Sequence, residues 1–233
     1  MKFLDDYQLL VPLRPTKDAP PSLVVMDTRK VVERAPMKTV FHLSPHFANS
    51  GELSIQLEPG VHSAVLAESP APFHQDPTQR IVVLRMESPP HHLVLQLGVL
   101  LKLLKDREGS EIGWDEWKSA VVVPCLDEDC WDVWVSGCRL FSARPMDDSR
   151  DSLVKMYDFS YRGFANSLSD EAPHGVGSPE LEAAFRSGAR YMLPIEARAP
   201  IPHSLPPWKV NPHICLDNFA WVSVFVLSTF ECD

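Results

Sequence analysis

Glycine is scarce in this 233-residue sequence, whereas proline is abundant. Ten glycines and 22 prolines reverse the usual order, because average usage gives about 16 glycines and about 12 prolines in a chain of this length. Proline lacks a backbone N–H and breaks the interior of a helix. The composition therefore argues against long uninterrupted helices, while the length predicts one or two domains with a substantial hydrophobic core.

Basic residues are fewer than acidic ones and are dispersed along the chain. Lys and Arg number 22 and Asp and Glu 31, which gives a net charge of −9. A nucleic-acid-binding protein needs a concentrated basic face, so we expect no nucleic-acid partner. The acidic runs at 127–129 and 147–148 are interpreted as solvated turns.

Long hydrophobic runs are also missing. The longest, at 93–101 and 219–230, are shorter than the roughly 20 residues that cross a bilayer. Asp5 and Asp6 interrupt the apolar start that a secretory signal requires. We therefore expect no membrane association, and we interpret the five cysteines as reduced thiols of a cytoplasmic or nuclear protein.

Short segments rich in Val, Ile, Leu and aromatic residues are bounded by Pro, Asp or Ser and predict β-strands. Ser136-Gly137 between two of them predicts a hairpin turn. The chain is predicted to be mainly β, with incomplete β-propeller-like or sandwich-like antiparallel sheets and two or three short helices. The predicted strands cover residues 23–26, 39–43, 53–57, 81–84, 120–123, 131–135, 139–141 and 153–159.

Two segments predict helices. The stretch 93–104 begins with alternating leucines, as in a strand, and then has the denser apolar pattern of a helix that ends before Gly109. The second helix has Ser178 as its N-cap, Pro179 at its first position and Gly188 as its left-handed stop.

The proline distribution divides the chain into two parts. Residues 1–193 are predicted to form one β-rich, propeller-like domain. Residues 194–233 are predicted to form a proline-rich wrap followed by a hydrophobic C-terminal tail. Six prolines fall between 194 and 212, and they favour polyproline II or edge-strand conformations.

No catalytic motif is present in the sequence, and we expect no catalytic residues, no cofactor and no metal. Cys125, Cys130 and Cys138 are separated by four and seven residues instead of the two-residue spacing of structural zinc sites. Ser136 lacks the surroundings of a nucleophile elbow. A small hydrolase or zinc-dependent enzyme that uses these cysteines or Ser136 is the alternative.

Four tryptophans are the candidate partner surface. Trp114 and Trp117 lie three residues apart, on one face if the segment is helical, whereas Trp131 and Trp134 lie in a predicted strand, on opposite faces. Large amphipathic rings such as these are used either in a core or in the centre of a protein interface.

The run at 100–118, together with 121–124 and 133–141, resembles the C-terminal region of F-box-type proteins that are greatly expanded in mushroom-forming fungi. The segments at 154–160 and 211–217 fit the same resemblance. It implies a non-enzymatic protein-interaction module of the SCF ubiquitin-ligase pathway. In that family an N-terminal F-box docks on the ligase adaptor, and a β-rich region recognises the target.

No F-box precedes the β-rich region in this sequence, so the resemblance implies a protein-binding role and does not extend to adaptor docking. The remaining alternative is a degenerate fragment without independent function. Such a fragment is expected to expose unpaired strand edges and to unfold without a sharp transition.

Overall fold

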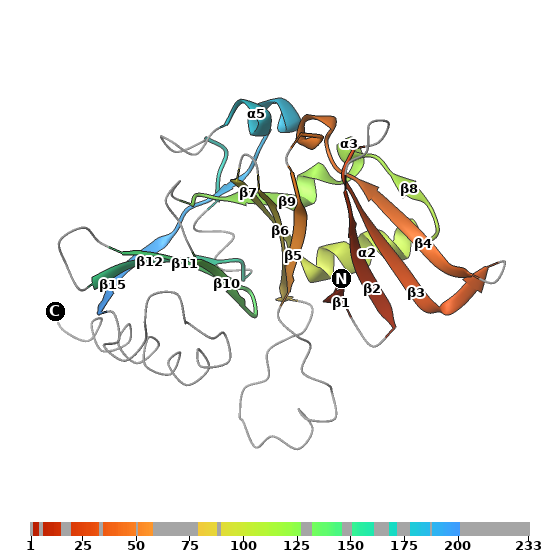
Figure 1. Cartoon of the computed structure of the whole chain (residues 1–233), viewed down its shortest axis with the longest axis horizontal. Coiled ribbons are helices and arrows are strands. Elements are labelled where there is room, and N and C mark those ends of the chain that lie inside the picture. Colours follow the sequence, from red (N-terminus) through yellow and green to blue (C-terminus); the bar gives the residue numbers. More distant parts are fainter. Residues whose placement is uncertain are drawn as a thin grey trace, which may run out of the picture.

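Over the residues that it describes, the computed structural model has three β-sheets and three short α-helices. A central six-stranded sheet lies between a five-stranded and a four-stranded sheet (Figure 1). The prediction of a mainly β chain with sandwich-like sheets is thereby confirmed. The structure describes residues 2–4, 7–14, 20–32, 35–49, 51–57, 79–87, 90–126, 132–145, 151–160, 168–171, 178–186 and 188–200.

The five-stranded sheet has the order β1-β2-β3-β4-β8. Its strands β2, β3 and β4 are antiparallel, whereas the short β8 pairs with β4 in parallel. Neither β1 nor β2 is among the predicted strands. The strands are β1 (Lys2–Phe3), β2 (Gln8–Leu13), β3 (Ser22–Val32), β4 (Ala35–His42) and β8 (Glu111–Ile112).

The six-stranded sheet has the order β13-β14-β9-β7-β6-β5. Residues 81–84 of its inner strand β6 are fully buried one after another. A strand reads as a continuous apolar run when both of its faces are covered, which matches the position of this sheet between two others. The strands are β5 (Leu53–Leu57), β6 (Ile81–Glu87), β7 (Pro90–Gln96), β9 (Val121–Pro124), β13 (Leu168–Ser169) and β14 (Tyr191–Met192).

The four-stranded sheet is antiparallel throughout, in the order β10-β11-β12-β15. The predicted hairpin joins its first two strands, with Gly137 at φ 60°, so that prediction is confirmed. The strands are β10 (Asp132–Ser136), β11 (Arg139–Pro145), β12 (Asp151–Asp158) and β15 (Ile195–Pro200).

Strand β15 lies in the segment predicted as a proline-rich wrap. It pairs with β12 along its whole length, and the predicted domain boundary after residue 193 stays a prediction. The place of β15 at the sheet edge agrees with the edge-strand conformation that the prolines favour. The rest of the predicted wrap and tail, 201–233, lies outside the described residues, as do the acidic runs at 127–129 and 147–148.

Both predicted helices are present, and a third, α3 (Trp114–Trp117), holds the tryptophan pair. Helix α2 (Leu97–Asp106) directly follows β7, as the change in apolar spacing predicts. Helix α5 (Pro179–Phe185) has Ser178 as its N-cap, with the Ser178 Oγ accepting from Leu181 N at 3.2 Å. The predicted stop at Gly188 is wrong, because Arg186 takes the left-handed position at φ 50° and its N–H bonds back to Glu182 O.

Candidate functional site: a groove between the five-stranded sheet and helix α2

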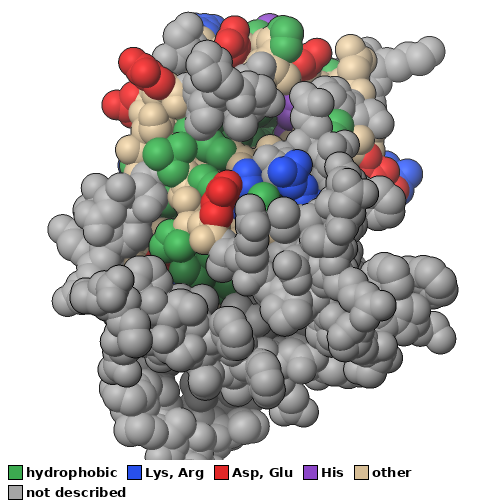
Figure 2. All heavy atoms as spheres, turned by 90° about the vertical axis from the view of Figure 1, so that its left-hand side faces the viewer, with side chains coloured by type: hydrophobic (Ala, Val, Ile, Leu, Met, Phe, Trp, Pro, Cys, Tyr) green, Lys and Arg blue, Asp and Glu red, His purple; other side chains and the backbone are tan. Residues whose placement is uncertain are grey.

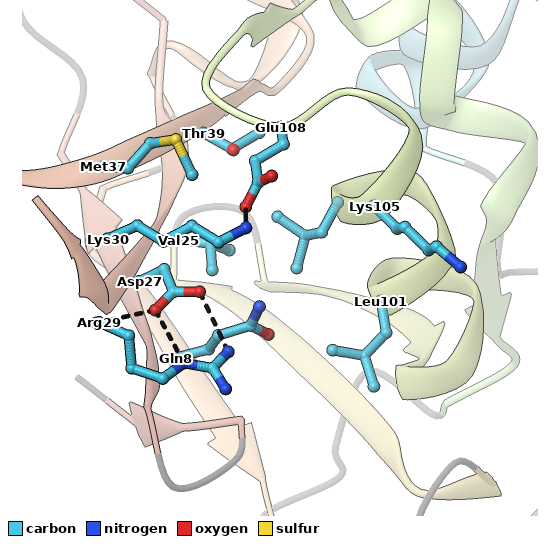
Figure 3. Close-up of a pocket in the computed structure, with 11 residues that line it drawn as sticks. Gln8, Val25, Asp27, Arg29, Lys30, Met37, Thr39, Leu101, Lys105 and Glu108 are labelled. Atoms are coloured by element: carbon cyan, nitrogen blue, oxygen red, sulfur yellow. Dashed lines mark hydrogen bonds and ion pairs between the residues drawn. The ribbon is translucent and has the colours of Figure 1, made fainter. Parts of the chain in front are cut away.

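A cavity of about 170 Å³ lies between strands β2–β4 and helix α2. Figure 3 shows it with sheet residues on one side and helix residues on the other. We call this cavity the α2 groove. It is lined by Gln8, Val25, Asp27, Arg29, Lys30, Met37, Thr39, Leu101, Leu104, Lys105 and Glu108.

The sheet side of the α2 groove consists of two rows of side chains that cross the strands. Strand pairing places Gln8, Asp27 and Met37 in one row. The next row continues through Val25 and Thr39. These residues share one face because alternate side chains of a strand point to the same side.

Helix α2 supplies the opposite wall. Leu97, Leu100 and Leu104 are buried, and Leu101 and Leu104 line the groove. The spacing of three and four residues puts these leucines on neighbouring positions of one helix face. The groove therefore lies between two regular elements, and the leucines of α2 supply the apolar part of its lining on the helix side.

Asp27 is unusual on the sheet face because it is a buried carboxylate. It lies on the same side of β3 as the buried Leu23 and Val25, four and two positions before it. The pairing of β3 with β4 has a register shift between Asp27 and Val31, directly after this side chain. Arg29 donates its backbone N to Asp27 Oδ1 at 2.9 Å, its Nε to Oδ1 at 3.3 Å and its Nη2 to Oδ2 at 3.2 Å. These bonds from Arg29 hold the pKa of Asp27 below its ordinary value.

Arg29 and Lys30 are themselves held in place at the rim of the α2 groove. The Arg29 guanidinium lies 4.3 Å from the centroid of the Tyr7 ring, in a cation–π contact. Lys30 Nζ forms an ion pair with Glu108, just beyond the end of α2. Figure 3 shows this pair spanning from the sheet to the helix side.

The turn after α2 is fixed to the sheet by Gly109. Its φ of +72° is a conformation that other residues adopt only with strain. In this conformation Gly109 N donates to Thr39 Oγ1 at 3.0 Å. This contact anchors the chain segment that carries Glu108.

The lining residues are suited to binding. Asp27 and Glu108 each have a cationic partner, so neither is a free general base, and the residues that line the groove include no histidine, cysteine or serine. The volume is below the roughly 300–1,000 Å³ of sites for drug-sized ligands. It accommodates a group of the size of a single apolar side chain.

No protein-family model, no curated protein and no solved structure gives a significant match to this chain. Within the described ranges, none of the helices has the length and apolar character needed to cross a membrane.

Two of the four tryptophans proposed as a partner surface are core residues. Trp114 is 6% exposed and Trp117 is 0% exposed. Their indole N–H groups donate to Ala184 O at 2.7 Å and to His42 O at 2.9 Å. The predicted helical spacing is present, but it turns both rings into the core, and their assignment to a partner surface is corrected.

The other two tryptophans belong to the β10 region. Trp134 is half-buried and stacks on Phe141 of β11, with 5.7 Å between ring centroids. Trp131 lies outside the described residues. Of the candidate partner surface, only Trp134 is thus described and not buried in the core.

The two described thiols among those named for the enzyme alternative have raised pKa values. Burial raises the pKa of Cys125 to about 11, and burial followed by the charge of Asp158 raises the pKa of Cys138. Reactive cysteines instead have lowered pKa values. Cys130 lies outside the described residues, and Ser136 ends β10 at the hairpin. Within the described ranges no group of three metal-ligating side chains comes together.

The sequence analysis did not identify the α2 groove. One signal was available in the strand pattern: Leu23 and Val25 are followed by Asp27 in the same alternating phase. A carboxylate in the buried phase of a strand indicates a local partner or a site. The helix that completes the groove is distant in sequence, so its contribution was not readable from spacing.

Replacing Asp27 with Asn is expected to lower the melting temperature at neutral pH, because it removes the carboxylate that Arg29 bonds. The pKa of Asp27 is lowered in the folded state, so its stabilisation is present above the ordinary carboxyl pKa and is lost as the pH falls through the folded value. Thermal melts at several pH values should show the difference from the unmodified protein shrinking in acid.

The control for this substitution is Glu52→Gln, which breaks the exposed Arg14–Glu52 pair. Exposed pairs contribute little to stability, so this variant should melt like the unmodified protein. An Asp27→Asn variant with the same melting temperature as Glu52→Gln at neutral pH would contradict a stabilising role of the Asp27–Arg29 pair.

Proposed function

We propose that this chain is a non-enzymatic protein-interaction module and that the α2 groove holds an apolar side chain of a partner protein. The observation that carries the proposal is a cavity of about 170 Å³ that is lined in part by apolar side chains of the sheet and of α2 and whose two carboxylates are both ion-paired. Small pockets that bury one anchoring side chain are typical centres of protein interfaces. The raised pKa values of Cys125 and Cys138 favour this function over the hydrolase alternative.

Charge at the rim favours an acidic neighbour beside the apolar side chain. The lining has three cationic residues, Arg29, Lys30 and Lys105, against the carboxylates of Asp27 and Glu108. The rim is thus positive by one charge although the whole chain carries −9. Complementary charge steers association and sets specificity, so the proposed ligand is an apolar residue next to Asp or Glu.

The resemblance of 100–118 and 133–141 to fungal F-box proteins supports a more specific proposal. In it, the chain acts in the cytoplasm or nucleus as a target-recognition region of the ubiquitin-ligase pathway. Part of the resembling run, 101–108, lines one wall of the α2 groove. The partner would then be a protein marked for ubiquitination.

Photo-cross-linking from the groove tests the binding proposal. A photoreactive phenylalanine analogue replaces Leu101, which lines the groove. The matched control carries the same analogue at Lys102, which is exposed on the same helix and does not line the cavity. Cross-linking in cells of the source organism should give a discrete protein adduct from position 101 and none from position 102.

A further inference from the structure

The face of the five-stranded sheet that points away from helix α2 is apolar. Val25 and Thr39 line the α2 groove, so the residues next to them, Val24 and Val40, lie on the opposite face, because side chains alternate along a strand. We call the apolar surface on that side the outer patch. It consists of Leu9 and Val11 of β2, Val24 and Met26 of β3, and Val40 of β4.

Strand pairing arranges the outer patch in three rows that cross the strands. Glu111 of β8 lies beside Val40 and extends the middle row. The two flanking rows end differently, because one ends on Lys38 and the other on His42. Read from β2 to β4, the rows are Leu9, Met26 and Lys38; Val11, Val24 and Val40; and Leu13, Ser22 and His42.

The residues of the outer patch are not part of the hydrophobic core. Leu23 and Val25 belong to the core cluster, whereas Val24 between them, although only 6% exposed, does not. The other four residues of the outer patch are half-buried, and Leu13 at its margin is 46% exposed. An antiparallel sheet with one solvated face normally carries polar residues on that face. A contiguous apolar patch in that place indicates an interaction surface.

The opposite side of the molecule also has hydrophobic side chains at its surface. Figure 2 views that side and shows them beside charged ones, bordered by residues that the structure does not describe. The outer patch is instead formed by described residues of three adjacent strands, at the other end of the molecule (Figure 1). The described residues therefore define both its outline and its charges.

One basic and one acidic side chain flank the outer patch near β4. Lys38 is exposed in the row on one side of Val40. On the other side His42 is held by two contacts: its Nδ1 lies 3.0 Å from Ser22 Oγ, and its Nε2 lies 3.2 Å from Glu111 Oε2. The second contact places the exposed carboxylate of Glu111 toward the His42 row. Opposite charges thus lie on the two sides of the middle row.

We infer that two copies of this chain form a two-fold symmetric dimer by packing their outer patches face to face. A half-turn about an axis along the middle row packs Val24 against Val24 of the second copy and exchanges the two flanking rows. Lys38 of each copy then faces Glu111 of the other. Every contact of such an interface occurs twice, and packed sheets of this kind keep their strands within about 30° of each other.

Charge complementarity selects a second copy over the other apolar partner that this chain offers. The C-terminal run at 219–230 is hydrophobic and carries no charge, so it offers no opposite charge to Lys38 or to Glu111. A second outer patch supplies both charges at the required places. Complementary charge fixes the register of an interface and discriminates between partners.

The size of the outer patch predicts a reversible dimer. Three strands about 4.8 Å apart and three rows about 7 Å apart span about 10 by 14 Å between the outermost Cα atoms, an area well below the roughly 800 Å² per partner of a standard interface. The α2 groove is on the other face of the same sheet, so both grooves stay on the outside of the dimer. Two linked grooves bind a bivalent target more tightly than one, whereas the dimer itself does not depend on the function proposed for the groove.

Sedimentation equilibrium of the full chain tests the dimer. The average mass should rise with protein concentration from that of one chain toward that of two, within the micromolar range, and should fall again on dilution. A mass equal to one chain at every concentration up to the high micromolar range, as expected if a segment of the same chain covers the outer patch, would overturn the inference.

Charge reversal tests the face and its symmetry. Lys38→Glu and Glu111→Lys should each weaken the dimer at least about tenfold, because each brings like charges together twice. The double variant restores opposite charges and should dimerise again, which is the result specific to this pairing. Lys102→Glu makes the same charge change at an exposed position of α2 and should leave the dimer unchanged.

Thermal melts of the same variants in dilute solution report that each monomer is folded. Equal weakening of the dimer by Lys102→Glu and Lys38→Glu would refute the assignment to the outer patch. A folded double variant that dimerises as weakly as the single variants would refute the pairing of Lys38 with Glu111 across the two-fold axis.

Discussion

Replacing Trp117 with Ala should destabilise the protein by about 3–5 kcal/mol, the usual cost of removing a buried large aromatic side chain. Trp117 is fully buried. Its ring meets Phe41 and Trp114 edge to face, with centroids at 5.6 and 5.1 Å. Because whole domains are stable by about 5–15 kcal/mol, the loss should lower the melting temperature by roughly 6–20 °C, as measured by calorimetry.

Two further variants separate the loss of ring packing from the loss of the indole hydrogen bond and from the effect of an exposed substitution. Trp117→Phe keeps an aromatic ring but leaves His42 O without its indole donor, and it should cost about 1–3 kcal/mol. Leu13→Ala changes a side chain that is 46% exposed and should change stability by about 0.5 kcal/mol or less. A Trp117→Ala variant as stable as Leu13→Ala would contradict the position of this ring in the core.

Replacing Tyr157 with Ala is expected to cost a similar amount, about 3–5 kcal/mol, but to act on a different part of the molecule. Tyr157 is fully buried in β12, and its hydroxyl donates to Cys125 O, just after β9 of the six-stranded sheet. The side chain therefore joins two sheets. Hydrogen exchange should become faster throughout β11 and β12 in the variant, and more so than in the five-stranded sheet.

Met156→Ala is the matched control, because Met156 is the adjacent residue on the opposite face of β12 and is half-buried. We expect it to cost about 1 kcal/mol and to leave the contact between the sheets intact. Tyr157→Phe should fall between the two, since it removes only the hydroxyl. If Met156→Ala increased exchange in β11 and β12 as much as Tyr157→Ala, the inter-sheet role of Tyr157 would be wrong.

The local parts of the fold were readable from the sequence because short-range physics decides them. Ser178 and Pro179 determine where α5 begins, and Gly137 allows the tight turn of the hairpin. The end of α5 was predicted wrongly at Gly188. The helix ends at Phe185, the last of its three buried residues, Leu181, Ala184 and Phe185. That burial comes from distant segments, and a glycine further along the chain does not override it.

The long-range parts were not readable in the same way. The pairing of β15 with β12 joins residues that are 39 to 49 positions apart in the sequence, and proline content indicates only that such a segment is extended. Similarly, two tryptophans on one helix face suit either a core or an interface. Only the packing of Phe41, Phe47 and Phe185 around them decides for the core.

The α2 groove also combines features that the local sequence indicates with features that depend on long-range packing. Four polar residues of the α2 groove, Asp27, Arg29, Lys30 and Thr39, lie on the two strands of the β3–β4 hairpin, where Asp27 interrupts an apolar alternation. Its apolar wall comes from α2, and its rim is closed by the Lys30–Glu108 pair between segments far apart in sequence. A site assembled across such distances follows from the topology of the sheets and not from a motif.

Mapping the cross-linked peptide from position 101 tests the role of the α2 groove most directly. The account predicts that the adduct maps to a single stretch of one partner, centred on an apolar residue beside Asp or Glu, and that Leu101 is the productive position. Adducts of equal yield from Lys102, or cross-links spread over many unrelated sequences with the protein still folded, would contradict a binding role for this groove.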